Sequence, residues 1–300
     1  MTPEGFTLWP RSAWAAIGRG RAPARAEPPT WSPVGKAEWD EVYVPLAHIV
    51  GLQMEERVAL HRRLAAAGLA GSGDGPFIIG IGGSVAAGKS TCAQTLATLL
   101  SARPGRPLVE VVGTDGFLLP NAELAARGLL ARKGFPETYD QPLMRRVLGA
   151  LATGVSPVVV PRYSHDVYDI AGDPQVIVRP DVVIVEGVTA LAFGSAELPV
   201  SAADFCALKI YLDADEPDLR GWFVARFRRL VDEAADDPSS FFAQWSGLRP
   251  TEVLSLAVTV WESVNLANLL EHILPTRWRA DLVLHKGCDH AVTSVAVRGR

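Results

Sequence analysis

The segment from Gly83 to Ser90 most strongly constrains what this 300-residue chain can fold into. It reads Gly-Ser-Val-Ala-Ala-Gly-Lys-Ser and matches the phosphate-binding loop pattern G-x-x-x-x-G-K-[ST]. An apolar, strand-like run over 77–81 precedes it and a helix-like run over 91–100 follows, as the pattern requires. Backbone N–H groups at such a helix N-terminus converge on phosphate oxygens. The pattern therefore predicts a binding site for ATP or GTP.

Each residue of the loop has an expected part in nucleotide binding. Lys89 pairs with the outer phosphates, and the hydroxyl of Ser90 holds Mg²⁺. The rest of the expected nucleotide site consists of Gly83, Ser84, Val85, Ala86, Ala87, Gly88 and Thr91. A chance glycine turn before a helix is the alternative, and the complete pattern with its flanks disfavours it.

Composition favours a soluble α/β protein with a large core, since 48% of the residues are hydrophobic. The net charge of −4 gives no overall attraction to nucleic acid or to anionic membranes. Cys92, Cys206 and Cys288 lie far apart without metal-ligand spacing, which suits a reducing cytoplasm. No stretch reaches the roughly 18 apolar residues of a membrane span. We therefore expect a cytoplasmic protein without nucleic-acid or membrane partners.

The order of strand-like and helix-like segments predicts a mostly parallel central sheet flanked by helices, with an N-terminal helical extension. Residues 1–36 mix Arg, Ala, Pro and Trp without a clear period, which predicts an irregular arm, and residues 37–300 are expected to form a single domain. The segment 114–141 is rich in Gly, Pro and charge, and predicts loops and short helices that form a lid or acceptor site. Strands are expected at 77–81, 108–112, 158–160, 182–185, 208–212, 281–285 and 291–297, and helices at 39–69, 91–100, 217–233 and 251–273.

Polar residues that follow strands are candidates for chemistry, because open parallel sheets bind ligands beyond the carboxyl ends of their strands. Asp115 is a candidate to accept a proton from a substrate hydroxyl, although aspartate before glycine is also common in turns. Glu186 is a candidate for holding Mg²⁺ or its water, or else for capping a loop. Tyr163 and His165 are candidates for an acceptor pocket, or else ordinary surface or core residues.

Two predicted helices carry further candidates. Arg226 either neutralises phosphoryl charge or faces solvent, as most helical arginines do. Asn265 and Asn268 are three apart on one helix face, and either bind a neutral polar substrate or cap and solvate the helix. Spacing alone leaves both alternatives open.

Seven motifs occur together and in order along the chain. They are the phosphate loop, Thr114-Asp-Gly-Phe117, Lys133-Gly-Phe-Pro-Glu-Thr-Tyr139, Pro161-Arg-Tyr-Ser-His165 with Tyr168-Asp169, Pro180-Asp-Val-Val-Ile-Val-Glu-Gly187, Asn265-Leu-Ala-Asn-Leu269 and Ile273-Leu-Pro-Thr-Arg277. In this combination the chain resembles the prokaryotic type I pantothenate kinase family, from about Tyr43 to the C-terminus. The combination is far more specific than the phosphate loop alone.

The resemblance implies a P-loop kinase fold and transfer of the ATP γ-phosphoryl group to the 4′-hydroxyl of pantothenate, the first step toward coenzyme A, with Mg²⁺ as cofactor. It also implies a cytoplasmic homodimer. In that family pattern Asp115 is the catalytic base, Lys89 and Arg226 stabilise the phosphoryl group, and Ser90 and Glu186 serve Mg²⁺.

The same resemblance assigns residues to the two substrates. It places Tyr163, His165 and Asn265 on pantothenate, and Lys286 and His290 at the border of the nucleotide base.

The chain departs from the family pattern near these sites. Phe223 stands beside the acceptor where a Tyr is usual, and Thr189 replaces an Asn. A lost Tyr hydroxyl costs about 0.5–1.5 kcal/mol, which weakens acceptor binding without abolishing it. Gln94 replaces a basic residue and His48 an arginine, and the lost charge at Gln94 predicts weaker feedback inhibition by coenzyme A.

Two alternative functions remain open at this point. One is a kinase for another small hydroxyl substrate, such as a pantothenate derivative or a nucleoside. The other is a non-catalytic copy that binds nucleotide or coenzyme A and regulates a partner.

Overall fold

A seven-stranded sheet forms the centre of the computed structural model, which describes residues 4–20, 27–69 and 75–299. The strand order is β1-β9-β8-β7-β2-β6-β3. The strands are β1 (Phe6–Pro10), β2 (Phe77–Gly83), β3 (Val109–Gly113), β6 (Val182–Glu186), β7 (Leu208–Asp213), β8 (Leu282–Lys286) and β9 (Val292–Arg298). All neighbours from β3 to β8 pair in parallel, whereas β9 pairs antiparallel with β8 and β1. The predicted mostly parallel sheet is confirmed.

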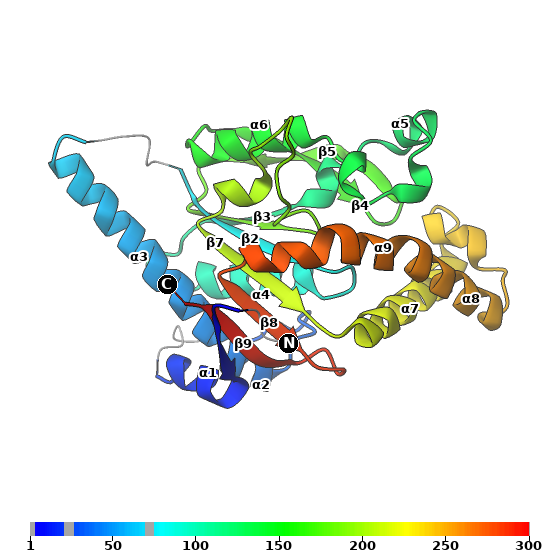
Figure 1. Cartoon of the computed structure of the whole chain (residues 1–300), viewed down its shortest axis with the longest axis horizontal. Helices are drawn as coiled ribbons and strands as arrows, with labels where there is room; N and C mark the ends of the chain where they lie inside the picture. The colour runs from blue at the N-terminus through cyan, green and yellow to red at the C-terminus, as the bar shows by residue number, and fades with distance from the viewer. Residues whose placement is uncertain (1–3, 21–26, 70–74, 300) are drawn as a thin grey trace.

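Helices flank this sheet, as expected (Figure 1). The helix α4 (Lys89–Ser101) packs against β2, β3 and β6, and α3 (Val44–Ala66) packs against α4. The other α-helices are α1 (Arg11–Gly18), α2 (Lys36–Glu38), α5 (Asn121–Ala126), α6 (Gln141–Ala152), α7 (Glu216–Glu233), α8 (Pro250–Val260) and α9 (Leu266–Asn268). Short 3₁₀ or π segments are η1 (Trp39–Tyr43), η2 (Thr114–Phe117), η3 (Leu130–Arg132), η4 (Pro136–Thr138), η5 (Ala202–Phe205), η6 (Ala234–Asp236), η7 (Phe241–Trp245), η8 (Trp261–Asn265), η9 (Leu269–Ile273) and η10 (Leu274–Arg279).

The central strand β2 explains why the phosphate loop lies where it does. All seven of its residues are buried, since β6 and β7 pair with it on either side and α4 covers one face. A near-continuous apolar run is typical of such a strand. A Cβ on Gly82 would lie 2.8 Å from the side chain of Leu191, so glycine permits close packing there.

The predicted irregular arm over residues 1–36 is wrong for part of that range. Residues 6–18 form β1 and α1, and β1 pairs with β9 at the edge of the sheet. The indole of Trp14 is fully buried and donates to the carbonyl oxygen of Val42 at 3.1 Å. These residues form a strand because they pair with β9, almost 290 residues later, although their local sequence has no strand period. Residues 1–3 and 21–26 of the expected arm lie outside the described residues.

The expected strand at 158–160 is present but belongs to a separate hairpin. β4 (Val158–Ser164) pairs antiparallel with β5 (Asp169–Ile177), which was not predicted, and the two form their own two-stranded sheet. β4 packs against η2, so the hairpin brings the motif that follows residue 160 beside the turn that carries Asp115. The expected mixture of loops and short helices over 114–141 is confirmed.

One helical stretch, Pro250–Arg279, is long and apolar enough to cross a membrane by length and composition, which corrects the expectation that no segment reaches that threshold. Core helices pass the same test, so the finding is weak evidence of a span. This stretch also makes polar contacts with the rest of the protein. Trp261 donates to Glu216 at 3.0 Å, and Asn268 donates to the carbonyl oxygen of Gly134 at 2.8 Å.

Candidate active site

The phosphate loop joins β2 to α4 through backbone conformations that glycine favours. Gly83 has φ 142° and Gly88 has φ 89°, and Ala86 adopts φ 63°. A Cβ on Gly83 would lie 2.6 Å from the carbonyl oxygen of Leu212 on β7, so this position has no room for a side chain. The loop is therefore held tightly against the carboxyl ends of two strands.

Lys89, Ser90 and Glu186 meet at the start of α4. The ammonium of Lys89 donates to the carbonyl oxygen of Ser84 at 2.8 Å, and the hydroxyl of Ser90 donates to Oε1 of Glu186 at 2.8 Å. Burial lowers the pKa of Lys89, and the carboxylates of Glu186 and Asp115 oppose that shift. Burial raises the pKa of Glu186, against the opposing effects of Lys89 and Ser90. These groups form one electrostatic cluster at the carboxyl ends of β2, β3 and β6.

The Ser90 and Glu186 pair offers ligands that fit Mg²⁺. A hydroxyl and a carboxylate are hard oxygen donors, and Mg²⁺ in nucleotide sites takes its other ligands from water and phosphates. Within the described residues no group of three or more His, Cys, Asp or Glu could hold a metal by itself. The donor set therefore fits a metal that enters with the nucleotide.

Asp115 lies in the 3₁₀ turn η2, immediately after β3. It is half-buried, and its Oδ1 accepts a hydrogen bond from the hydroxyl of Tyr139 at 3.2 Å. Burial lowers the pKa of Lys89 and raises that of Glu186; the charge of Asp115 opposes the first shift and adds to the second, so Asp115 interacts electrostatically with the phosphate loop. The predicted base therefore lies within electrostatic reach of the predicted nucleotide site.

The hairpin β4–β5 supplies a group of rings near Asp115, since β4 packs against the turn η2. The rings of Tyr163 and His165 lie 5.2 Å apart edge to face, and burial lowers the pKa of His165 while Asp115 opposes that shift. Lys133, which sequence reasoning did not select, lies 4.9 Å from the ring of Tyr163 and 4.5 Å from that of Tyr168. Its ammonium also donates to the Tyr168 carbonyl oxygen at 2.6 Å. A polar and aromatic wall therefore faces the candidate base.

Arg226 and Phe223 lie on α7, where the sequence placed them. Arg226 is exposed. Burial lowers the pKa of Lys89 and of His165 and raises that of Glu186; the charge of Arg226 adds to the first two shifts and opposes the third, so it acts on both the loop and the acceptor side. Phe223 packs 5.7 Å from the ring of Trp261, at the start of the π segment η8 that ends at Asn265.

Asn265 is half-buried, and no side-chain hydrogen bond joins it to the other described residues. Within the described chain, most of the predicted site residues are therefore connected by contacts or electrostatic interactions, whereas Asn265 has no side-chain hydrogen bond to any of them. Its neighbour Asn268 donates to the carbonyl oxygen of Gly134 and makes no side-chain cap bond, so it ties this helical stretch to the 114–141 segment rather than capping a helix.

Lys286 and His290 lie beside the phosphate loop from the far end of the chain. The ammonium of Lys286 donates to the carbonyl oxygen of Ala87 at 3.0 Å. His290 stacks on the indole of Trp222 at 3.7 Å, and that indole donates to the Cys288 carbonyl oxygen at 3.1 Å. Lys286 thus contacts the loop directly, and His290 adjoins it through Trp222, a residue that no sequence signal identified. Their place at the border of the nucleotide base stays a prediction.

A buried ionic cluster next to the loop was also missed. Asp213 ends β7 and accepts from Arg277 at 2.8 Å and from His285 at 3.2 Å. Although burial opposes the shift, His285 and Arg277 hold the pKa of Asp213 below its ordinary value. Arg277 belongs to the quoted Ile273-Leu-Pro-Thr-Arg277 motif, which was the available signal. The cluster fastens η10 to the sheet.

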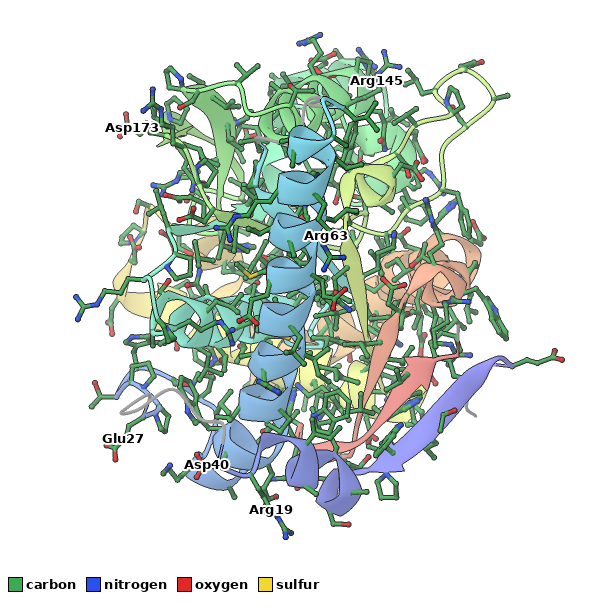
Figure 2. All side chains as sticks on the ribbon, turned by 90° about the vertical axis from the view of Figure 1, so that its left-hand side faces the viewer. Arg19, Glu27, Asp40, Arg63, Arg145 and Asp173 are labelled. Atoms are coloured by element: carbon green, nitrogen blue, oxygen red, sulfur yellow. The ribbon has the colours of Figure 1, made fainter. Side chains whose placement is uncertain are left out.

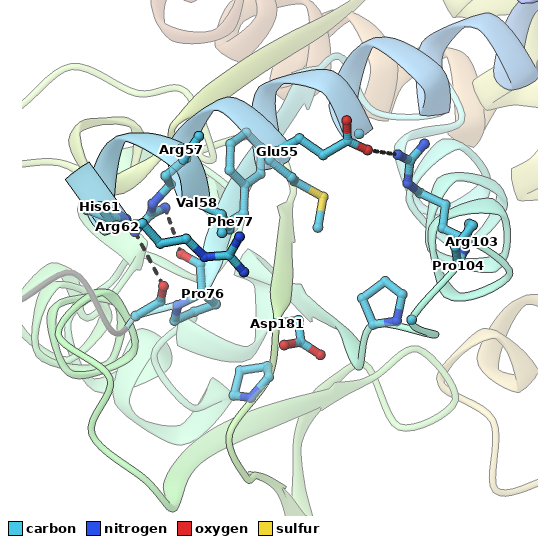
Figure 3. A pocket seen from close by; sticks show the side chains of 17 residues that line it. Glu55, Arg57, Val58, His61, Arg62, Pro76, Phe77, Arg103, Pro104 and Asp181 are labelled. Carbon is cyan, nitrogen blue, oxygen red and sulfur yellow. Dashed lines mark hydrogen bonds and ion pairs between the residues drawn. The ribbon is translucent and has the colours of Figure 1, made fainter. Parts of the chain in front are cut away.

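A separate cleft of about 590 Å³ lies at the amino ends of β2, β3 and β6 (Figure 3). Arginines of α3 and Arg103 line it, and Arg57 donates to the carbonyl oxygen of Pro76 at 3.0 Å. None of the predicted site residues lines this cleft. It lies at the opposite end of the strands from the phosphate loop.

The fold and the loop define a P-loop phosphotransferase. Residues 78–229 match the phosphoribulokinase/uridine kinase family. A solved structure of D-glycerate 3-kinase from Cryptococcus neoformans var. grubii resembles the chain with a TM-score of 0.55 and 13% identity, over 83% of this chain and 98% of that one. At that identity the likeness supports the fold.

Two relatives identify the family within this class of phosphotransferases. Pantothenate kinase from Rhodopseudomonas palustris (strain TIE-1) is 45% identical over 87% of this chain and 84% of its own length. Pantothenate kinase from Shouchella clausii is 40% identical over 98% of this chain and 96% of its own. The chain belongs to the type I pantothenate kinase family.

Proposed function

We propose that this protein transfers the γ-phosphoryl group of ATP to the 4′-hydroxyl of pantothenate. The observation that carries the proposal is the setting of Asp115: its charge acts on Lys89 and Glu186 at the phosphate loop and on Tyr163 and His165, and its turn η2 packs against the hairpin strand β4 that carries Tyr163. A nucleotide on the loop and an acceptor hydroxyl on the wall formed by Tyr163 and His165 would both adjoin this carboxylate. The identity of the curated relatives supports pantothenate as the acceptor.

In this proposal Asp115 accepts the proton of the attacking hydroxyl. Lys89 and Arg226 balance the negative charge on the transferring group, which is the main demand of phosphoryl transfer. Tyr163, His165 and Asn265 bind pantothenate, with Phe223 packed beside it, and Lys286 and His290 adjoin the base of ATP. Mg²⁺, held by Ser90 and Glu186, would neutralise phosphate charge when bound.

The proposal also covers the domain bounds, the cellular location, the partners and the oligomeric state of the enzyme. We assign the kinase domain to residues 37–300, with β1 and α1 over residues 6–18 packed onto it as the edge of the same sheet. We place the protein in the cytoplasm and assign no nucleic-acid or membrane partner. We further propose a homodimer, supported by the exposed apolar side chains of α3 at Leu52, Leu60 and Leu64. Figure 1 shows α3 along one side of the molecule, and Figure 2 shows it in front when that side is viewed directly.

The test is an ADP-release assay with Mg-ATP and pantothenate, pantetheine, uridine or no acceptor. Turnover should require pantothenate and should fall about 10²–10⁴-fold in Asp115→Asn, because general base catalysis contributes that much. A loss below threefold would move the role of base to another group. Faster turnover with uridine than with pantothenate would favour the nucleoside alternative. ATP binding without turnover of any acceptor would favour the regulatory alternative.

A further inference from the structure

Tyr139 is a buried residue that the proposed chemistry does not use. It ends the motif that begins at Lys133, it is 5% exposed, and its hydroxyl donates to Oδ1 of Asp115 at 3.2 Å. Burial raises the pKa of this phenol well above its ordinary value, and the charge of Asp115 raises it further. The hydroxyl therefore keeps its proton at any working pH and is a permanent neutral donor.

The backbone around Tyr139 is fastened to the turn that carries Asp115. Tyr139 and Leu118 form an antiparallel bridge, and backbone hydrogen bonds of 2.7 and 2.8 Å on either side join residues 117–119 to 138–140. The Tyr139 ring also belongs to the main hydrophobic core. Both partners of the hydroxyl–carboxylate bond are thus held by backbone contacts, and the bond has little freedom to rearrange.

We propose that Tyr139 is a positioning residue, whose hydroxyl holds the Asp115 carboxylate through Oδ1 and leaves Oδ2 to accept the proton of the substrate hydroxyl. The inference rests on the proposed role of Asp115 as base. A base must lie within hydrogen-bond reach of the proton it removes, and a second fixed bond limits rotation of the carboxylate.

Several titratable groups interact with the charge of Asp115. Those that interact with its charge, from the loop, the sheet, the hairpin and the 114–141 segment, are Lys89, Lys133, Tyr139, Tyr163, His165, Tyr168 and Glu186. Within the described chain, Tyr139 is the side chain that donates a hydrogen bond to this carboxylate. Its replacement therefore changes the base without removing a charge.

The experiment compares Tyr139→Phe with the unmodified enzyme and with Tyr211→Phe. Tyr211 is a matched control, because it is buried on β7 and its electrostatic partners are Asp213 and Arg277. We expect kcat/KM for the acceptor to fall roughly tenfold in Tyr139→Phe, with KM for ATP unchanged. The loss should fall on kcat, with KM for pantothenate unchanged, because the carboxylate that accepts the proton is less firmly oriented. The control should keep the kinetic constants of the unmodified enzyme.

A readout that needs no acceptor separates this inference from the proposed function. The carboxyl ¹³C signal of residue 115, assigned with Asp115→Asn, should shift at a fixed pH in Tyr139→Phe and stay in place in Tyr211→Phe, because only the first variant removes a hydrogen bond to that carboxylate. If no acceptor is turned over, the proposed function fails and this signal alone decides the inference. An unchanged signal overturns it, as does a Tyr139→Phe variant that loses thermal stability while keeping kcat, because Tyr139 would then be structural only.

Discussion

Replacing Gly187 with alanine should disable the site through one steric contact. Gly187 follows the magnesium candidate Glu186 and has φ 151°, a conformation that other residues rarely adopt. An added Cβ would lie 1.7 Å from Oγ1 of Thr114, where ordinary contacts begin at 3.4 Å. Thr114 is fully buried and directly precedes Asp115. The clash therefore forces apart the two strand ends that carry the base and the metal ligand.

The size of the effect follows from this geometry. Relieving the contact requires a displacement of 3.4 − 1.7 = 1.7 Å. Backbone strain costs about 1–3 kcal/mol and overpacking another 1–3 kcal/mol, so Gly187→Ala should lose about 2–6 kcal/mol of stability. Misplacement of a reacting group by about 1 Å costs on the order of 10²-fold in rate, which sets the expected loss in kcat.

Three variants isolate the cause. The buried Oγ1 of Thr114 has no hydrogen-bond partner in the described chain, so Thr114→Ala alone should be mild, and combined with Gly187→Ala it should restore part of the lost kcat. Gly221→Ala on α7 is the control, because its Cβ would meet nothing within 4 Å. Thermal unfolding and kcat at saturating ATP and pantothenate are measured for each. The reasoning is refuted if Gly187→Ala keeps more than a third of kcat, or if Thr114→Ala gives no rescue.

Three further outcomes are expected. Asp213→Asn should cost about 3–5 kcal/mol of stability at pH 7, because Arg277 is left as an uncompensated, largely buried charge. The lowered pKa of Asp213 means that its contribution is complete above about pH 4 and is lost as the pH falls further, so urea unfolding should find the difference shrinking in acid. Gln94→Lys at this exposed position should strengthen inhibition by coenzyme A about two- to fivefold. The inhibition constant of coenzyme A is measured against ATP. An unchanged constant would contradict the proposed role of this position in feedback. The double substitution Leu60→Glu with Leu64→Glu places charges on the exposed face of α3 and should give a monomer in light scattering. A variant that remains a dimer would place the interface elsewhere.

Local patterns were sufficient for the core of the fold. The strand at 77–81, the helix at 91–100 and the loop between them were predictable, because apolar runs, glycine positions and the Lys-Ser pair are all contiguous in sequence. Phosphate binding is built from adjacent backbone N–H groups, so its signature survives without tertiary information. The order of the motifs was likewise enough for the family.

Other features depend on residues that are distant in sequence. The N-terminal strand β1 needs β9 as its partner, so its residues have no local period that reveals it. The hydrogen bond from Tyr139 to Asp115 joins positions 24 residues apart, and no spacing rule selects that pair.

The sequence by itself determined a nucleotide-binding P-loop fold, the family and the residue types available for chemistry, because those depend on contiguous patterns. Only the tertiary structure decided which of those residues meet. It placed Asp115 against Tyr139, put Gly187 where only glycine fits beside Thr114, and left Asn265 without a hydrogen bond to the other described side chains. Such contacts depend on how strand ends and loops pack in three dimensions, and that packing is a property of the whole chain.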